Sequence, residues 1–184
     1  MSRRVSLKEF QEGLTKRIKA AAGETAPTAR LGFEAGGEHW LARLDHSGEV
    51  FQVPDVQRVP LTRDWFLGVA NIRGALFGVT DFGAFLGKPL TARGPDNRLL
   101  LIGQPFGVNC ALHVSRLVGL RSVADFEAEP PSGPLAVWSA AAWRDKEGRV
   151  WRELDTERLL AHREFMDIAV HLRRTRDQRR IHGF

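Results

Sequence analysis

From Leu31 onward the sequence consists of short runs of strand-forming residues, separated by turn residues about every eight to twelve positions. Gly36-Gly37 and Arg73-Gly74 each lie between two such runs, which predicts two tight hairpins. Short strands in this arrangement are typical of a small barrel or sandwich. Strands and helices do not alternate regularly, so a doubly wound parallel sheet is not expected. The pattern predicts a mainly β fold.

Helices are expected at the two ends of the chain. Residues 6–22 place apolar side chains at steps of three and four, and Ser6 and Glu9 have the spacing of a capping box, so we predict an amphipathic helix. A second helix is expected over residues 155–172, because its apolar positions also share one face. These positions are Leu159, Leu160, Met166, Ala169 and Val170.

The domain organisation follows from these elements. We expect an N-terminal helix and linker at residues 1–28, one folded domain at 29–170 and a basic tail at 173–184. The strands form two groups, which predicts two β-subdomains at roughly 29–90 and 91–155. The acidic, proline-rich stretch at residues 124–134 is expected to be a loop.

Three internal positions have a predicted structural role. Asp81 directly follows an apolar strand and is expected to cap a helical turn over Phe82–Leu86. The run Trp65–Leu67 is too apolar to be left in water, so it should plug a barrel end or an interface. Gly68 allows the chain to turn sharply into the next strand.

The net charge of +5 is concentrated at the ends of the chain. Residues 1–22 carry six basic and two acidic side chains and residues 171–184 carry five and one, which leaves 16 basic and 19 acidic residues elsewhere. One interpretation is therefore a small-barrel protein that binds nucleic acid through its basic ends. A nucleic-acid-binding domain is expected to carry a basic patch on its folded body, which argues against this interpretation. Solvated helix ends or attraction to an acidic protein explain the same charge.

No stretch approaches the ~20 consecutive apolar residues that a membrane span needs. The basic start is not followed by the apolar segment of a signal peptide. We therefore expect a cytoplasmic protein that does not insert into the membrane.

The sequence contains no recognised catalytic or metal-binding pattern. It has no Gly-rich phosphate loop, no nucleophile elbow and no histidine pair at ligand spacing. Its one cysteine, Cys110, excludes an internal disulfide and a cysteine-based zinc site, and is expected to be buried. Asp45 beside His46 could support acid–base chemistry, but such a pair is far more often an exposed turn. We predict no catalytic residue, no cofactor, no metal and no enzyme activity.

One segment carries a longer pattern. It contains Glu49-Val50 and Pro54, then Gly68-Val69-Ala70-Asn71-Ile72-Arg73-Gly74, then Asp81 and a turn that ends at Leu86-Gly87. The second half adds Val114-Ser115-Arg116-Leu117-Val118-Gly119. In order and spacing these motifs resemble the CheW-like coupling proteins of bacterial chemosensory arrays, over roughly Ala29 to Leu160. Ser115 and Gly78 depart from the family, which often has Asp and Pro at these positions.

This resemblance implies two five-stranded, SH3-like barrels packed side by side, with an N-terminal and a C-terminal helix. It also implies an adaptor that couples the cytoplasmic tip of a methyl-accepting chemoreceptor to the regulatory domain of a histidine kinase. The segments Trp65–Gly74 and Phe85–Gly87, together with the N-terminal helix, are most similar to the twitching-motility branch of the family. In that branch the output is extension and retraction of type IV pili.

The resemblance also implies which residues bind partners. Asn71, Arg73 and Gly74 are the candidates for the receptor-facing turn, where the Arg73 guanidinium would bind carboxylates or backbone carbonyls. Glu49 and Val50 lie on the adjoining strand and are expected to shape the same groove or the kinase contact. From the residues alone, Arg73-Gly74 is equally well explained as a solvated hairpin turn.

Overall fold

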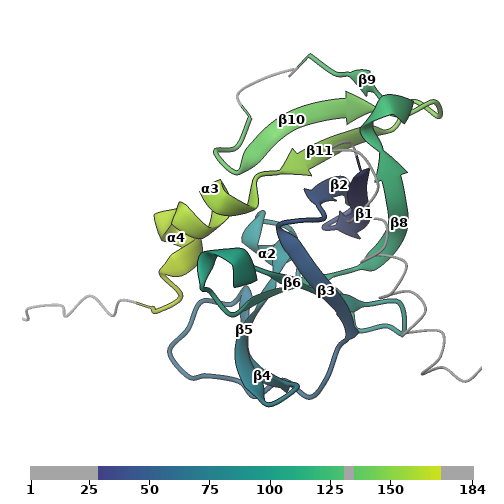
Figure 1. Cartoon of the computed structure of the whole chain (residues 1–184). Helices are drawn as coiled ribbons and strands as arrows, with labels where there is room; N and C mark the ends of the chain where they lie inside the picture. The colour runs from purple at the N-terminus through teal and green to yellow at the C-terminus, as the bar shows by residue number, and fades with distance from the viewer. Residues whose placement is uncertain (1–28, 131–134, 171–184) are drawn as a thin grey trace, which may run out of the picture.

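The computed structural model describes residues 29–130 and 135–170. The helix predicted over residues 6–22 and the basic tail predicted at 173–184 lie outside these described residues. The described chain is mainly β and forms two sheets, one above the other in Figure 1, with short helices between and beside them. This confirms the predicted mainly β fold.

The first sheet has six strands in the order β8-β1-β2-β11-β10-β9. All neighbours in it are antiparallel except β2 and β11, which run parallel. Its strands are β1 (Ala29–Ala35), β2 (Glu38–Arg43), β8 (Arg116–Ser122), β9 (Glu127–Ala128), β10 (Ser139–Arg144) and β11 (Val150–Leu154).

The second sheet has five strands in the order β3-β6-β7-β5-β4. Here β5 and β7 are the parallel pair, and the other neighbours are antiparallel. Its strands are β3 (Ser47–Gln52), β4 (Phe66–Ile72), β5 (Ala75–Asp81), β6 (Arg98–Ile102) and β7 (Cys110–Val114). The 3₁₀ helix η1 (Gln104–Phe106) joins β6 to β7, and a second one, η2 (Val123–Asp125), joins β8 to β9.

The two sheets divide the strands differently from the predicted subdomains at 29–90 and 91–155. The first sheet places β1 and β2 between β8 and β11, which come from the second half of the chain, and the second sheet extends from β3 to β7. The physical reason is that β2 pairs with β11, whereas β3 leaves that sheet and pairs with β6. The expected number of five strands applies to the second sheet and not to the first.

The predicted hairpins are confirmed. Gly36 and Gly37 join β1 to β2 with positive φ angles of 59° and 77°, and Arg73-Gly74 joins β4 to β5. The loop predicted at residues 124–134 contains a strand that the composition did not indicate, because β9 pairs with β10 through Ala128 and Trp143.

The short helix α2 (Phe82–Phe85) begins as predicted at Asp81, whose Oδ1 accepts a hydrogen bond of 3.1 Å from the backbone N–H of Ala84. Gly68 lies inside β4 and not at a sharp turn into the strand as predicted. Its φ is 135°, and a Cβ at this position would lie 2.0 Å from the backbone oxygen of Gln57. Only glycine allows the two chain segments to approach so closely.

The single helix predicted over residues 155–172 is wrong. The described residues form two short helices instead, α3 (Thr156–Ala161) and α4 (Arg163–Met166), separated by His162, whose backbone is extended with ψ of 121°. The chain beyond α4 then pairs with the segment at residues 61–63. The N–H of Arg63 donates to Ile168 O at 2.8 Å, and the N–H of Val170 donates to Leu61 O at 2.9 Å.

The apolar residues form two buried clusters. The first lies between the sheets and includes Phe33, Trp40 and Phe82, each fully buried. The second lines the other face of the five-stranded sheet, and its buried members are Ala70, Ile72, Phe77, Val79, Leu99, Leu101 and Ala111. Because alternate residues of β6 belong to different clusters, both faces of this strand are buried, which explains its continuous apolar run.

The apolar run that begins at Trp65 lies where the sheets and helices meet. The Trp65 ring packs against Phe85 and Phe165, with ring centroids 5.3 and 6.2 Å away, and Phe66 is buried. Burial of one such side chain stabilises the fold by roughly 1.5–3 kcal/mol. None of the described helices has the length and apolar character that a membrane span requires.

Candidate partner-binding site

The candidate site is the tip of the β4–β5 hairpin. β4 ends at Ile72 and β5 begins at Ala75, so Arg73 and Gly74 form a two-residue turn. Their φ angles are 52° and 85°, and positive φ at both residues is the geometry of a type I′ turn. The Oδ1 of Asn71 accepts a 2.9 Å hydrogen bond from the N–H of Gly74 and fixes the turn. The three residues predicted to face the receptor therefore form one local structure.

Arg73 occupies a backbone conformation that is unfavourable for its side chain. A left-handed conformation costs a residue with a Cβ about 1–2 kcal/mol, and type I′ turns prefer Asn or Gly at this position. The side chain nevertheless remains 65% exposed. Residues held in such conformations are concentrated at functional sites, because the surrounding structure must maintain them.

Two residues of β3 hold the guanidinium of Arg73. Its Nη1 lies 2.5 Å from Oε2 of Glu49, and its Cζ lies 4.9 Å from the ring centroid of Phe51. Glu49 and Phe51 are two positions apart in a strand and thus lie on the same face. A cation over an aromatic ring contributes about 0.5–1 kcal/mol at an exposed site.

Val50 is not part of this surface. It is half-buried and packs against the cluster between the sheets, on the opposite side of β3 from Glu49. Of the predicted residues, the structure thus brings together Glu49, Asn71, Arg73 and Gly74. The prediction missed Phe51, although the alternation of side chains along a strand places it beside Glu49.

The turn also carries an exposed apolar side chain that the sequence did not single out. Leu76 pairs with Asn71 across the hairpin and is 63% exposed. This exposed leucine lies on the same hairpin as Arg73, so the hairpin offers both an apolar and a cationic group.

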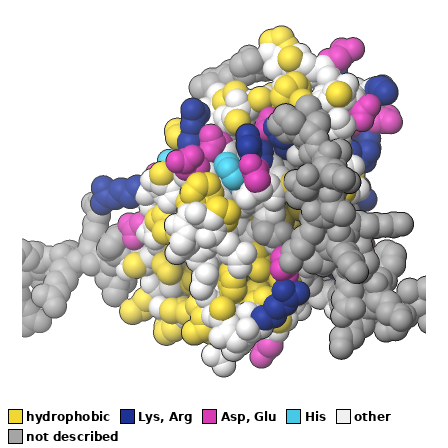
Figure 2. All heavy atoms as spheres, in the orientation of Figure 1, with side chains coloured by type: hydrophobic (Ala, Val, Ile, Leu, Met, Phe, Trp, Pro, Cys, Tyr) yellow, Lys and Arg dark blue, Asp and Glu magenta, His cyan; other side chains and the backbone are white. Residues whose placement is uncertain are grey.

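Charges elsewhere on the described surface are largely paired. Figure 2 shows acidic and basic side chains next to one another over the six-stranded sheet, whereas hydrophobic side chains gather lower down, around β4 and β5. Arg116 binds Glu34 at 2.6 Å, and its hydrogen bonds lower the pKa of the Glu34 carboxyl. Glu38 likewise contacts Arg152 at 2.8 Å and Lys88 at 3.3 Å.

The described residues contain no group of three or more His, Cys, Asp or Glu side chains that could hold a metal ion. Cys110 is buried, and its burial raises the pKa of the thiol to about 12, so it is not a nucleophile at neutral pH. Asp45 binds the Arg43 guanidinium at 2.7 Å, which lowers the pKa of the Asp45 carboxyl. Asp45 is therefore a poor proton acceptor for acid–base work with His46.

The sequence and the fold are similar to those of known proteins. A family model described as the CheW-like domain matches residues 30–164. Protein PilI of Pseudomonas aeruginosa is 28% identical over 142 residues, which cover 76% of this chain and 79% of that protein.

Among solved structures, the crystal structure of the scaffolding protein TtCheW from Thermoanaerobacter tengcongensis has the same fold. The TM-score is 0.60 at 16% identity, and the match covers 70% of this chain and 89% of that one. The chain therefore belongs to the CheW-like domain family and is accordingly a non-catalytic scaffold of chemosensory signalling.

Proposed function

We propose that this protein is the adaptor that couples a methyl-accepting chemoreceptor to a histidine kinase, with the Arg73 turn facing the receptor. The observation that carries the proposal is the geometry of Arg73. Its side chain is exposed, its backbone has the strained left-handed conformation, and Glu49 and Phe51 hold its guanidinium in place. Maintenance of the fold does not require an arginine there, because Asn or Gly would make the same turn at lower conformational cost.

The chemistry of the turn suits the tip of a helical hairpin. A guanidinium offers five N–H donors in a planar fork, so Arg73 can bind a carboxylate or backbone carbonyls of the partner while it remains near Glu49. An exposed ion pair contributes only about 0–1 kcal/mol, so the guanidinium is readily shared with a partner. Leu76 would bury its exposed side chain against an apolar residue of the receptor helix.

The second partner in this proposal is the regulatory domain of the kinase, and the complex assembles in the cytoplasm at the receptor tip. The pathway we propose is the control of type IV pili and twitching motility. This narrower proposal is supported by the similarity to Protein PilI over most of both chains.

We further propose that each sheet curls into an SH3-like barrel. In the five-stranded sheet, β3 and β4 are the two edge strands of the described ladders. An antiparallel bridge between Gln57 and Val69 nevertheless joins the segment after β3 to β4, with both hydrogen bonds at 2.8 Å. The contact of Arg73 with Glu49 brings the same two edges together at the hairpin tip.

The adaptor role is tested by reconstitution of receptor, kinase and this protein. We expect the Arg73→Glu variant to lose receptor-dependent stimulation of kinase autophosphorylation, because it places a second carboxylate beside Glu49. Its circular dichroism spectrum should stay unchanged. The matched control is Arg163→Glu, which makes the same charge change at an exposed position of α4 and should couple normally. Full coupling by Arg73→Glu would refute the receptor-facing role of the turn.

A further inference from the structure

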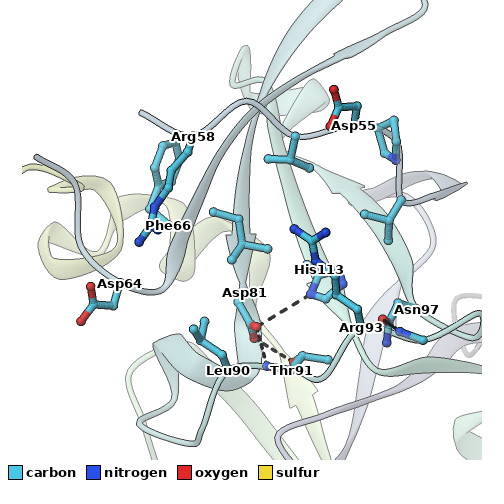
Figure 3. A pocket seen from close by; sticks show the side chains of 15 residues that line it. Asp55, Arg58, Asp64, Phe66, Asp81, Leu90, Thr91, Arg93, Asn97 and His113 are labelled. Atoms are coloured by element: carbon cyan, nitrogen blue, oxygen red, sulfur yellow. Dashed lines mark hydrogen bonds and ion pairs between the residues drawn. The ribbon is translucent and has the colours of Figure 1, made fainter. Parts of the chain in front are cut away.

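A second site lies at the other end of the same hairpin. A cavity of about 490 Å³ opens where β4 begins and β5 ends, and Phe66, Leu67 and Asp81 line it (Figure 3). This volume lies within the roughly 300–1,000 Å³ of small-molecule sites, which occur preferentially in places such as the mouths of β-barrels.

The floor of the cavity holds a buried pair of titratable residues, Asp81 and His113, which are 1% and 4% exposed. Asp81 accepts hydrogen bonds from the N–H of Ala84 at 3.1 Å and from the N–H and hydroxyl of Thr91 at 2.7 and 2.9 Å. Burial acts to raise the pKa of the Asp81 carboxyl, but His113 and these donors outweigh it and lower the pKa. The capacity of Asp81 to accept hydrogen bonds is thus largely used within the protein.

His113 faces Asp81 at the floor of the cavity (Figure 3). Its Nδ1 lies 3.8 Å from Oδ2 of Asp81, beyond hydrogen-bond distance, and it has no hydrogen-bond partner among the described residues. The two side chains together make the floor of the cavity polar, which favours a ligand that carries a polar group there.

The rim of the cavity carries charges of both signs. Arg58, Arg93, Asp55 and Asp64 line it, all four are exposed, and none forms an ion pair with the described part of the chain. Figure 3 shows Arg58 and Asp64 on one side of the opening and Arg93 on the other, near the His113 side. This differs from the rest of the described surface, where guanidinium and carboxylate groups are largely paired with one another.

We propose that this cavity binds a small amphipathic zwitterion of about the size of a dipeptide. The carboxylate of the ligand would bind the arginine side chains, and its ammonium group would bind the rim carboxylates. The apolar side chain would lie against Phe66 and Leu67, where His113 supplies a further polar contact. A simple anion fits less well because Asp55 and Asp64 would repel it, and a purely apolar ligand would make no use of the charged rim and the polar floor. This site is separate from the adaptor role and does not depend on it.

The test uses three probes on the full chain, with isothermal titration calorimetry and backbone amide NMR. Glycyl-phenylalanine has both charges, its N-acetyl derivative lacks the ammonium group, and its C-terminal amide lacks the carboxylate. We expect saturable binding of the first probe with shifts at the amides of Leu67 and His113. Each derivative should bind at least tenfold more weakly, because each loses a charge-assisted interaction.

Variants test whether glycyl-phenylalanine binds in the cavity. Arg58→Gln and Arg93→Gln should each weaken the binding of glycyl-phenylalanine several-fold, whereas Arg163→Gln, at an exposed position outside the cavity, should not change it. Val53→Trp places a large ring at a half-exposed position of the opening and should abolish binding while the fold is retained.

Two results would overturn the proposal. One is the absence of saturable binding by all three probes up to about 10 mM, a range that includes millimolar Kd values. The other is equal binding of all three probes, or binding that is unchanged in both arginine variants. Because coupling of the receptor to the kinase is measured separately, failure here leaves the adaptor role standing.

Discussion

The Nη1 of Arg73 lies 2.5 Å from Oε2 of Glu49, although the two residues belong to opposite edges of the five-stranded sheet. Arg73 follows β4, the last strand in the order, and Glu49 lies on β3, the first. The hairpin tip is therefore fixed by this contact with the opposite edge strand as well as by its own turn. The contact gives the turn a defined position relative to β3, and the Arg73 side chain remains exposed.

The strain at Arg73 predicts opposite effects of one substitution on stability and on function. Arg73→Asn gives the Asn-Gly pair that type I′ turns prefer. We expect the free energy of unfolding to rise by up to about 1 kcal/mol. The variant removes the backbone strain of an arginine in the left-handed conformation, and this gain outweighs the loss of an exposed ion pair. Receptor coupling should fall at the same time. Urea denaturation and the reconstituted kinase assay measure the two quantities.

A second variant at the same turn serves as a control. Asn71→Ala removes the acceptor of the 2.9 Å hydrogen bond from Gly74 and should lower the free energy of unfolding by about 1 kcal/mol. If Arg73→Asn destabilised the protein by more than Asn71→Ala, the arginine would have a structural role and our interpretation of the strain would be wrong.

The features that the sequence predicted well depend on residues close together in the chain. The turn at Gly36-Gly37 and the cap at Asp81 each involve residues within about four positions, so local patterns indicate them. The pairing of β2 with β11 joins distant segments, and no local pattern encodes it. The order of the strands in the six-stranded sheet could therefore not be predicted from the sequence.

The same distinction applies to the C-terminal helix and to the site. The apolar spacing through Val170 fits a helix, but pairing of residues 168–170 with 61–63 outweighs that propensity. In the motif, Glu49 and Val50 are adjacent residues, yet the alternation of side chains along β3 places them on opposite sides of the strand. Phe51 could have been found from that alternation, whereas Leu76 becomes visible only once the hairpin register is known.

Asp81 predicts a pH dependence of stability. Its pKa in the folded protein lies below the ordinary value of 3.8, so folding favours the ionised form. The resulting stabilisation is present above that ordinary value and is lost as the pH falls through the lower folded value. Asp81→Asn should cost about 1–3 kcal/mol at pH 7, because it removes a charged acceptor from buried donors. The difference in the free energy of unfolding between the variant and the wild type should narrow near pH 3.

Urea denaturation at pH 7 and pH 3 measures the free energy of unfolding of Asp81→Asn and of the wild type. Asp96→Asn is the matched control because it makes the same change at an exposed residue, and its stability should follow the wild type at both pH values. An Asp81→Asn penalty that is equally large at both pH values would show that geometry, and not the charge of the carboxylate, stabilises the wild type.

The nucleic-acid interpretation predicts a different result from ours. On the described surface, arginines such as Arg116, Arg144 and Arg152 already bind carboxylates at 2.6–2.8 Å. A guanidinium that is paired in this way has little charge to offer a phosphate backbone. We therefore expect no retardation of DNA or RNA in a gel shift at low salt. Retardation that weakens steeply with added salt would support binding through phosphate contacts and contradict this expectation.

Two glycines of the β4–β5 hairpin should respond very differently to the same substitution. At Gly68 the new Cβ would lie 2.0 Å from Gln57 O, whereas at Gly74 it would meet nothing within 4 Å. Gly74→Ala should therefore lower the free energy of unfolding only by the strain of a left-handed alanine, about 1–2 kcal/mol. Gly68→Ala should lower it several times more or prevent folding. Thermal and urea unfolding of both variants measures the difference. Equal costs would mean that the bridge between Gln57 and Val69 can open without loss of stability.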